Sequence, residues 1–311
     1  MTTLLYNHPV CAEHDMGYGH PECPDRLTAI YRALKQPDFA DLQWREAPAA
    51  TLKQLTRIHP QRYVDRILAS VPQHGTRALD GDTALCPQSG EAALRAAGAV
   101  CAAVDAIMTG EAHNAFCAVR PPGHHAEPSR AMGFCVFNNV AIGAAHARAE
   151  YGLGKVAIID FDVHHGNGTQ AAFERQPEYM YISSHQSPLY PGTGRRSERG
   201  MGNIVNLPLS PYSGSEEIRD GWVTLMAPAL HTFRPDFIFI SAGFDAHQMD
   251  PLAQLNFTED DYDWLTREIL DMAAEFCQGR VISTLEGGYN LSALAASAAV
   301  HVKALLEAPQ G

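Results

Sequence analysis

The sequence has little positive charge and no long apolar run, and both absences limit what the protein can be. Its 311 residues include 23 lysines and arginines against 35 aspartates and glutamates, a net charge of −12. Because an acidic surface repels phosphate backbones, we expect no direct binding to nucleic acid. No stretch approaches the roughly 18 apolar residues of a membrane span, and the first residues contain no basic and apolar leader. We therefore expect a cytoplasmic protein without a membrane segment.

Paired cysteines and several common catalytic motifs are also absent. The seven cysteines are scattered along the chain and include no CxxC pair. This argues against a disulfide framework or a thiolate zinc site, and we interpret each cysteine as a small core residue. The GxSxG, Walker A and GxGxxG patterns are missing too, which argues against a serine hydrolase or a nucleotide-binding protein.

Short apolar runs alternate with longer segments of helical periodicity, and no low-complexity linker divides them. Strands buried on both faces are predicted at residues 114–119, 156–161, 179–183, 237–242 and 281–285. Helices are predicted at residues 89–109, 136–150, 215–233, 259–277 and 291–305, with shorter ones at 24–34 and 61–71. This alternation predicts an α/β fold, a single domain over residues 1–311 with a central, mostly parallel sheet and helices on both faces.

Polar residues follow most of these strands, at the edge of a parallel sheet where ligands bind. Asp162 and His164 lie two residues apart, so both side chains can point the same way. Asp245 follows another strand and is the natural third ligand. Two carboxylates and one imidazole suit Zn²⁺ or Fe²⁺ with an open position for water. Each motif alone is also compatible with chance, and Asp245 with a helix cap.

A histidine pair, His124 and His125, follows a rigid proline and glycine turn. Two imidazoles with different partners suit general acid and base catalysis near neutral pH. A buried Asp160 would hold one ring as imidazolium, whereas the uncharged Asn167 would orient the other without raising its pKa much. Asp160 is also compatible with a strand-end carboxylate paired with lysine or arginine.

Aromatic residues next to glycines are candidates for binding the substrate. Gly287 and Gly288 precede Tyr289, whose hydroxyl could stabilise an oxyanion. Phe134 follows Gly133, and Tyr190 lies in a loop with glycine, so both aromatics could line a narrow apolar channel. From these segments alone, a packed tyrosine and ordinary loop anchors are equally compatible interpretations.

Five segments, in order along the chain, resemble motifs of the histone deacetylase superfamily. They are RPPGHH, IDFDVHHGNGTQ, LYPGTG, SAGFDAH and LEGGYN. The resemblance runs from His20 to Tyr289 and is strongest to the class II deacetylases and their bacterial homologues, the acetylpolyamine amidohydrolases. It implies an arginase-like α/β fold and zinc-dependent hydrolysis of an acetylated amine.

The resemblance also assigns roles to individual residues. It implies zinc ligands at Asp162, His164 and Asp245, tandem histidines at His124 and His125, and a transition-state tyrosine at Tyr289. It implies a structural monovalent cation, K⁺ or Na⁺, at Asp160, Asp162, His164, Ser183 and Ser184, and a second one at the backbone of Phe173, Gln176 and Tyr179. The implied substrate channel contains Gly133, Phe134, Tyr190 and Leu252.

Three positions refine this resemblance. Asn167 stands where class I members have aspartate, which is the class II form. Tyr289 differs from the histidine of the weakly active class IIa enzymes, so we expect real deacetylase activity. Leu252, after Asp250 and Pro251, stands where polyamine-preferring members have glutamate, which argues against polyamine preference through that position.

The leading hypothesis is therefore metal-assisted hydrolysis of an acylated lysine in a peptide or protein, or of a small acetylated amine. His125 would take a proton from water, and Tyr289 would stabilise the oxyanion. One alternative is a reader of acyl-lysine without catalysis, which would not need a base and a tyrosine. Another is a two-metal ureohydrolase, which would need a carboxylate where this sequence has Gly166.

Overall fold

The computed structural model describes residues 2–308, and an eight-stranded sheet forms its centre. The strands follow the order β2-β1-β5-β10-β9-β6-β7-β8, and every neighbouring pair is parallel. Their bounds are β1 Thr3–Asn7, β2 Gln43–Glu46, β5 Asn114–Cys117, β6 Val156–Asp160, β7 Tyr179–Gln186, β8 Ile204–Leu209, β9 Phe237–Ala242 and β10 Val281–Leu285. The predicted α/β fold with a parallel sheet is confirmed.

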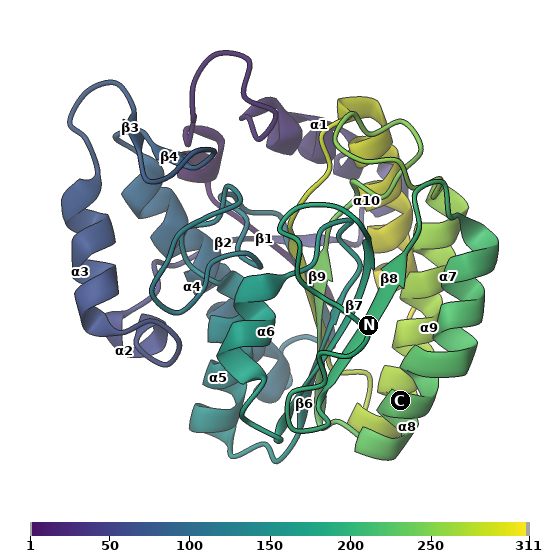
Figure 1. Ribbon diagram of the computed structural model, residues 1–311. Coiled ribbons are helices and arrows are strands. Elements are labelled where there is room, and N and C mark those ends of the chain that lie inside the picture. Colours follow the sequence, from purple (N-terminus) through teal and green to yellow (C-terminus); the bar gives the residue numbers. More distant parts are fainter. Residues whose placement is uncertain (1, 309–311) are drawn as a thin grey trace.

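Helices cover both faces of this sheet, so its central strands are buried throughout. Figure 1 shows α4 and α5 on one face and α9 and α10 on the other. The main helices are α1 Asp25–Leu34, α3 Gln61–Ser70, α4 Ser89–Met108, α5 Asn139–Tyr151, α6 Asn167–Phe173, α7 Ser215–Gly221, α8 Ala227–Phe233, α9 Glu259–Cys277 and α10 Leu291–Leu306, and α2 is the single turn Leu52–Leu55. Every residue of β5, β6, β9 and β10 is buried, as expected for strands covered on both faces.

Local sequence signals fix several helix ends. The carboxylate of Asp261 accepts a hydrogen bond from the Thr258 backbone N–H at 2.9 Å, which closes a capping box at the start of α9. The Asn138 side chain accepts from the backbone N–H of Ala141 at 3.0 Å, so α5 begins at Asn139, three residues later than predicted. Helix α9 has the bounds that the sequence predicts.

The predicted helix over residues 215–233 is interrupted. A π-helical segment, Trp222–Met226, separates α7 from α8, and Pro228 lies in the first turn of α8. Proline lacks an N–H, and its ring collides with the carbonyl one turn earlier, so a regular α-helix cannot pass through this position. The wider π turn accommodates the proline.

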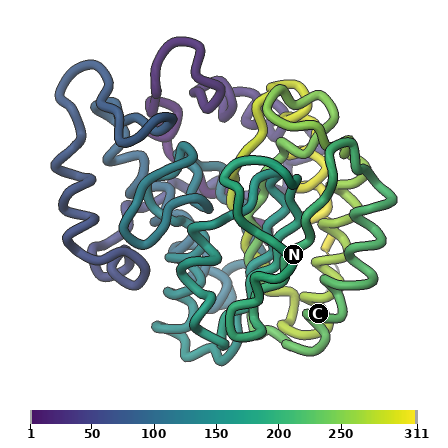
Figure 2. Tube along the Cα trace, viewed as in Figure 1, coloured from purple at the N-terminus to yellow at the C-terminus, as the bar shows by residue number. Residues whose placement is uncertain are grey.

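The strands β1, β2 and β8 of the sheet and one small ribbon were not predicted. β2 and β8 lie at the two edges of the sheet, and β2 is mostly exposed, so neither has the continuous apolar pattern of a buried strand. A separate antiparallel ribbon is formed by β3, Arg77–Ala78, and β4, Ala84–Leu85. Figure 2 shows that this ribbon and α3 form the side of the molecule opposite α7 and α9.

Because all strands are parallel, the carboxyl ends of all eight lie along the same side of the sheet, called its carboxyl edge below. Strands β5, β10, β9, β6 and β7 are consecutive in the sheet, so the loops after them lie side by side. These are the loops that contain the polar motifs. Among the described residues, no helix is long and apolar enough to cross a membrane.

Candidate active site

Three potential metal ligands meet at the carboxyl edge of the sheet. Asp162 and His164 follow β6, and Asp245 follows the adjacent strand β9. Nδ1 of His164 lies 3.1 Å from Oδ1 of Asp162 and 3.1 Å from Oδ2 of Asp245. One donor atom of each residue lies within 4.8 Å of the others. The structure thus brings together the three residues that the sequence suggests as zinc ligands.

The surroundings of these ligands suit a divalent cation. The side chains of Asp162 and Asp245 are buried, and backbone N–H groups hold them: Gly287 donates to Asp162 at 2.8 Å, and Val163 to Asp245 at 2.9 Å. A Cβ atom on Gly287 would lie 2.1 Å from Oδ2 of Asp245, so only glycine leaves room for both carboxylates. Two buried carboxylates this close need a positive charge between them, and two carboxylates with one imidazole are a donor set typical of Zn²⁺ or Fe²⁺.

The pKa values of the ligands also indicate a site that binds a positive charge. Burial would lower the pKa of His164, but its hydrogen bonds to Asp162 and Asp245 raise it to about 10. Burial, and then the charge of Asp162, raise the pKa of Asp245. Each shift means that the pair of carboxylates binds a positive charge tightly, whether a proton or a metal ion.

The two histidines of the pair have different partners. Nδ1 of His124 lies 3.0 Å from Oδ2 of Asp160, and Nδ1 of His125 lies 2.8 Å from Oδ1 of Asn167. The Asn167 amide group donates in turn to Glu127 at 2.9 Å, which fixes the amide with its oxygen toward His125. An amide oxygen only accepts hydrogen bonds, so we assign the proton of His125 to Nδ1. Its Nε2 is then left with a lone pair that can accept a proton.

These partners separate the pKa values of the two imidazoles. Burial would lower the pKa of His124, but the charges of Asp162 and Asp160 raise it well above its usual value. Burial and the positive charges of His124 and His164 lower the pKa of His125 well below its usual value. His124 is therefore charged and His125 neutral near pH 7, which distinguishes an electrostatic residue from a candidate base.

Asp160 lies beneath the pair and has no arginine or lysine partner among the described residues. Its side chain is fully buried, and it accepts hydrogen bonds from the Tyr181 hydroxyl at 2.8 Å and the Asp162 backbone at 3.2 Å. Together with His124, these contacts satisfy the carboxylate without a second basic residue. The ion pair with lysine or arginine that the sequence left open is therefore not present.

The serines expected beside a monovalent cation lie on β7, next to β6. The Ser183 hydroxyl is 2.9 Å from Nδ1 of His185. The Ser184 hydroxyl is buried and has no hydrogen-bond partner among the described residues. A buried hydroxyl without a partner costs free energy, so a polar ligand is expected near it.

At the second expected cation position, a side-chain amide contacts the backbone carbonyls. The backbone carbonyl oxygens of Phe173, Gln176 and Tyr179 all accept hydrogen bonds from Nδ2 of Asn203, at 2.9, 3.0 and 2.7 Å. An amide nitrogen therefore already occupies the point where these carbonyls converge. A monovalent cation stays a prediction at both positions, and the unpartnered Ser184 hydroxyl supports the one near Asp160.

A cavity of about 200 Å³ leads from the surface to the ligands. His125, His164 and Tyr289 line it, together with the expected channel residues Gly133, Phe134, Tyr190 and Leu252. The Tyr190 ring meets the His125 ring edge-on, with centroids 5.2 Å apart, and Phe134 meets Tyr289 in the same way at 5.9 Å. The channel thus has aromatic walls, and the candidate catalytic residues His125 and Tyr289 line it with them.

Gly133 is required at its position. It has a φ of +57°, and a Cβ atom there would lie 2.4 Å from Cδ2 of His125. Its backbone N–H donates to Asp82 at 3.1 Å, and Asp82 also lines the cavity. The close approach of this loop thereby sets one wall of the channel.

Tyr289 is held from behind by a buried arginine. The guanidinium of Arg26 lies 4.9 Å from the centroid of the Tyr289 ring and donates to the Gly288 carbonyl at 2.7 Å. Arg26 is itself paired with the buried Glu22 at 2.9 Å. The Tyr289 hydroxyl makes no hydrogen bond within the described part of the chain, so it is free to donate to a substrate. Burial and the charge of Asp245 raise its pKa well above its usual value, which keeps the hydroxyl protonated.

The sequence did not single out several residues that support this site. Glu286 accepts hydrogen bonds from the backbone of Gly123 at 2.6 Å and of His124 at 3.1 Å. Asp250 accepts from the backbone of Tyr289 at 2.7 Å. The i, i+4 spacing of Glu22 and Arg26 is the only one of these signals that is visible in the sequence.

Comparison with known proteins identifies the family of this chain. The sequence pattern of the histone deacetylase domain matches residues 20–305. The chain is 40% identical to histone deacetylase 14, chloroplastic, of Arabidopsis thaliana over 97% of this chain and 76% of that protein. It is 39% identical to a histone deacetylase-like amidohydrolase of Pseudomonas aeruginosa over 88% of this chain and 73% of that protein.

A solved structure matches the fold over its whole extent. The crystal structure of the HDA15 HD domain superposes with a TM-score of 0.93 and 36% sequence identity, and it covers 100% of this chain and 91% of that one.

Proposed function

Because the chain belongs to the histone deacetylase family, we propose that it is a zinc-dependent amidohydrolase that removes acetyl groups from acylated lysine or a related amine. One observation supports this most directly: His164 of the metal-ligand group, the neutral His125 and Tyr289 all line one cavity. Asp162, His164 and Asp245 would hold the ion, with Zn²⁺ or Fe²⁺ suited to this donor set.

The reaction divides among the residues of the channel. A divalent ion in this site supplies a Lewis acid that makes water more acidic and polarises the acyl carbonyl. His125 accepts the proton of the attacking water at Nε2, because Asn167 holds its Nδ1–H. Tyr289 donates its hydroxyl to the developing oxyanion, and His124 adds positive charge nearby. His125 then returns the proton to the departing amine.

The aromatic walls bind the alkyl part of the substrate. Phe134 and Tyr190 offer apolar surface to the methylene chain of an acyl-lysine, while Leu252 adds an apolar side chain where an acidic residue would bind a second amine. This favours acyl-lysine over acetylated polyamines. K⁺ or Na⁺ near Asp160, Ser183 and Ser184 would serve to stabilise the loop that contains the ligands.

Two observations argue against the alternatives. A reader of acyl-lysine needs no neutral imidazole beside the ligand group, yet His125 lies there. A two-metal site would need a carboxylate at position 166. There, a Cβ atom on Gly166 would lie 2.4 Å from Oδ2 of Asp160 and from the Tyr181 hydroxyl, so the position has no room for one.

The test is the release of acetate from an acetyl-lysine peptide, measured beside acetylated polyamines and longer acyl-lysines, with and without a chelator. We expect release from the acetyl-lysine peptide that a chelator abolishes. Peptide binding without release would instead favour the reader. Faster turnover of acetylated polyamines than of the peptide would contradict the proposed substrate preference.

A further inference from the structure

A second pocket, separate from the catalytic cavity, has a concentration of positive charge. It measures about 300 Å³ and lies between α3, the β3–β4 ribbon and the loop after the histidine pair. Arg66, Arg77 and Arg130 line it, with Asp80 as its one acidic residue. In a chain with a net charge of −12, three arginines around one pocket are an exception that calls for an anionic partner.

The three guanidinium groups have no anionic partner in the part of the chain that the structure describes. No carboxylate among residues 2–308 lies within 4.0 Å of any of them. Asp80 is engaged elsewhere, since its carboxylate accepts from the backbone of Thr83 at 2.8 Å. The charge of the arginines is therefore available to a ligand.

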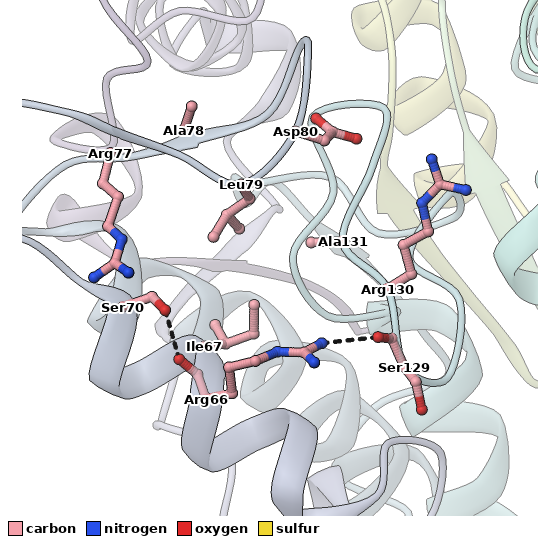
Figure 3. Close-up of a pocket in the computed structure, with 10 residues that line it drawn as sticks. All are labelled: Arg66, Ile67, Ser70, Arg77, Ala78, Leu79, Asp80, Ser129, Arg130 and Ala131. Atoms are coloured by element: carbon pink, nitrogen blue, oxygen red, sulfur yellow. Dashed lines mark hydrogen bonds between the residues drawn. The ribbon is translucent and has the colours of Figure 1, made fainter.

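One of these arginines is held in place. Arg66 donates to the Ser129 carbonyl at 2.9 Å, and its guanidinium lies 5.2 Å from the centroid of the Tyr63 ring. Figure 3 shows Arg66 on α3, Arg77 on the β3–β4 ribbon and Arg130 on the loop at the other side of the pocket. An arginine fixed in this way loses less conformational entropy when it binds a carboxylate.

The pocket lies next to the catalytic channel because the same two loops contribute residues to both linings. Asp80 and Ala131 line the pocket, and Asp82 and Gly133, each two residues further along, line the channel. Two residues span at most about 7 Å of extended chain. The hydrogen bond from Gly133 to Asp82 ties both loops together at this boundary.

We propose that this pocket is a substrate subsite, in which Arg66, Arg77 and Arg130 bind the carboxylate of an acidic residue close in sequence to the acyl-lysine. This inference rests on the proposed deacylase function and names the class of peptide that the site prefers. A side chain within about three residues of the acyl-lysine can reach from the channel to the pocket. The same charges would repel the free amines of a polyamine.

The experiment uses pairs of labelled acetyl-lysine peptides that differ only in glutamate against glutamine, at each position within about three residues of the acetyl-lysine. Acetate release gives kcat/KM, and fluorescence anisotropy gives the binding constant of the same peptides. We expect at least one glutamate peptide to exceed its glutamine partner about fivefold in both measurements, with the preference falling at high salt.

Variants locate this preference on the pocket. Arg66→Gln and Arg130→Gln should reduce the preference toward equality, with little change for the glutamine peptides. Arg62→Gln, at another position of α3 that does not line the pocket, is the matched control and should keep the preference.

Equal constants for every pair, or a preference that survives both pocket variants, would overturn the proposal. If no peptide releases acetate, the proposed function fails, but the anisotropy measurement still decides whether the pocket selects an acidic residue.

Discussion

At the scale of single residues, the carboxylate of Asp250 supports two walls of the cavity at once. Its Oδ2 accepts from the backbone N–H groups of Tyr289 and Asn290 at 2.7 and 3.3 Å, and its Oδ1 accepts from Leu252 at 3.0 Å. Burial, and then the charge of Asp245, raise its pKa to about 7. Asp250 thus positions the loop of Tyr289, the proposed oxyanion donor, relative to the channel wall, and it does not itself line the cavity.

Asp250→Asn tests this positioning role. Asparagine has one acceptor oxygen where aspartate has two, so the backbone of either Tyr289 or Leu252 loses its acceptor. We therefore expect kcat to fall about tenfold with little change in KM. In a Tyr289→Phe background, Asp250→Asn should lower kcat much less, because the side chain that Asp250 positions no longer has its hydroxyl.

If the effects of Asp250→Asn and Tyr289→Phe on the logarithm of kcat were fully additive, this would contradict a role of Asp250 through Tyr289. Asp263→Asn, on the exposed side of α9, is the matched control and should leave kcat unchanged. Thermal unfolding of each variant separates a loss of stability from a loss of positioning.

Tyr289→Phe tests the oxyanion donor itself. The ring remains, with its packing on Phe134 and Arg26, and only the hydroxyl is lost. Removing one such donor costs on the order of a hundredfold in kcat. Steady-state acetate release checks this value, and undiminished turnover would refute the role of the hydroxyl.

The site residues that directly follow a strand could be identified from the sequence. The residues that hold them in place through hydrogen bonds could not. Asp162 and Asp245 come after apolar runs, so the parallel sheet alone predicts that they lie at one edge. Arg26 acts on Gly288, 262 positions away, and Asp250 acts on Tyr289, 39 positions away. No local pattern reveals such contacts, because they depend on the complete tertiary fold.

At the scale of elements, buried strands could be predicted from the sequence, whereas edge strands could not. The sequence predicts both ends of Phe237–Ala242 and Val281–Leu285, because these short runs are rich in apolar and β-branched residues and are bounded by polar or glycine-containing segments. Gln43–Glu46 pairs on one side only and is largely exposed, so polar residues are tolerated there and hide the strand. Pro228 marks the interruption of the helix predicted over residues 215–233, which helical periodicity alone does not reveal.

His301 connects α9, α10 and β10 and gives a pH-dependent prediction. Nδ1 of His301 lies 2.7 Å from the Thr266 hydroxyl, and Nε2 lies 2.8 Å from that of Ser283. Burial lowers its pKa to about 3. The unfolded chain therefore binds a proton near pH 6.5 that the folded chain does not, so stability is complete above pH 6.5 and is lost as the pH falls toward 3.

His301→Gln removes this titration. Between about pH 7 and pH 5, the linkage relation gives a loss of about 2 kcal/mol from this group in the wild type alone. The stability advantage of the wild type over the variant should shrink by that amount. Denaturant unfolding of both proteins at the two pH values measures it, and a difference independent of pH would contradict the account.

At the scale of the whole molecule, the parallel sheet is what assembles the site. Residues from the loops after β5, β6, β9 and β10 meet only because all strands end at one edge. The cost is a cluster of buried carboxylates in which Asp160, Asp162 and Asp245 lie near one another without exposure to water. A cation in the ligand group offsets that cost, so the ion should stabilise the entire fold and not only the reaction.

Removal of metal should therefore lower the melting temperature. An ion present at a thousand times its dissociation constant adds about 4 kcal/mol, which corresponds to at least several degrees in a chain of this size. Calorimetry before and after chelation, followed by return of Zn²⁺, measures the shift. The same treatment of Asp245→Asn should give a much smaller shift, and equal shifts would mean that the ion binds elsewhere.

The most direct measurement is acetate release from an acetyl-lysine peptide as metal-free protein is titrated with Zn²⁺. The account predicts no release without metal, a rise in proportion to added zinc, and a plateau at one ion per chain. Full activity in the metal-free protein, or a plateau only at two ions per chain, would contradict it.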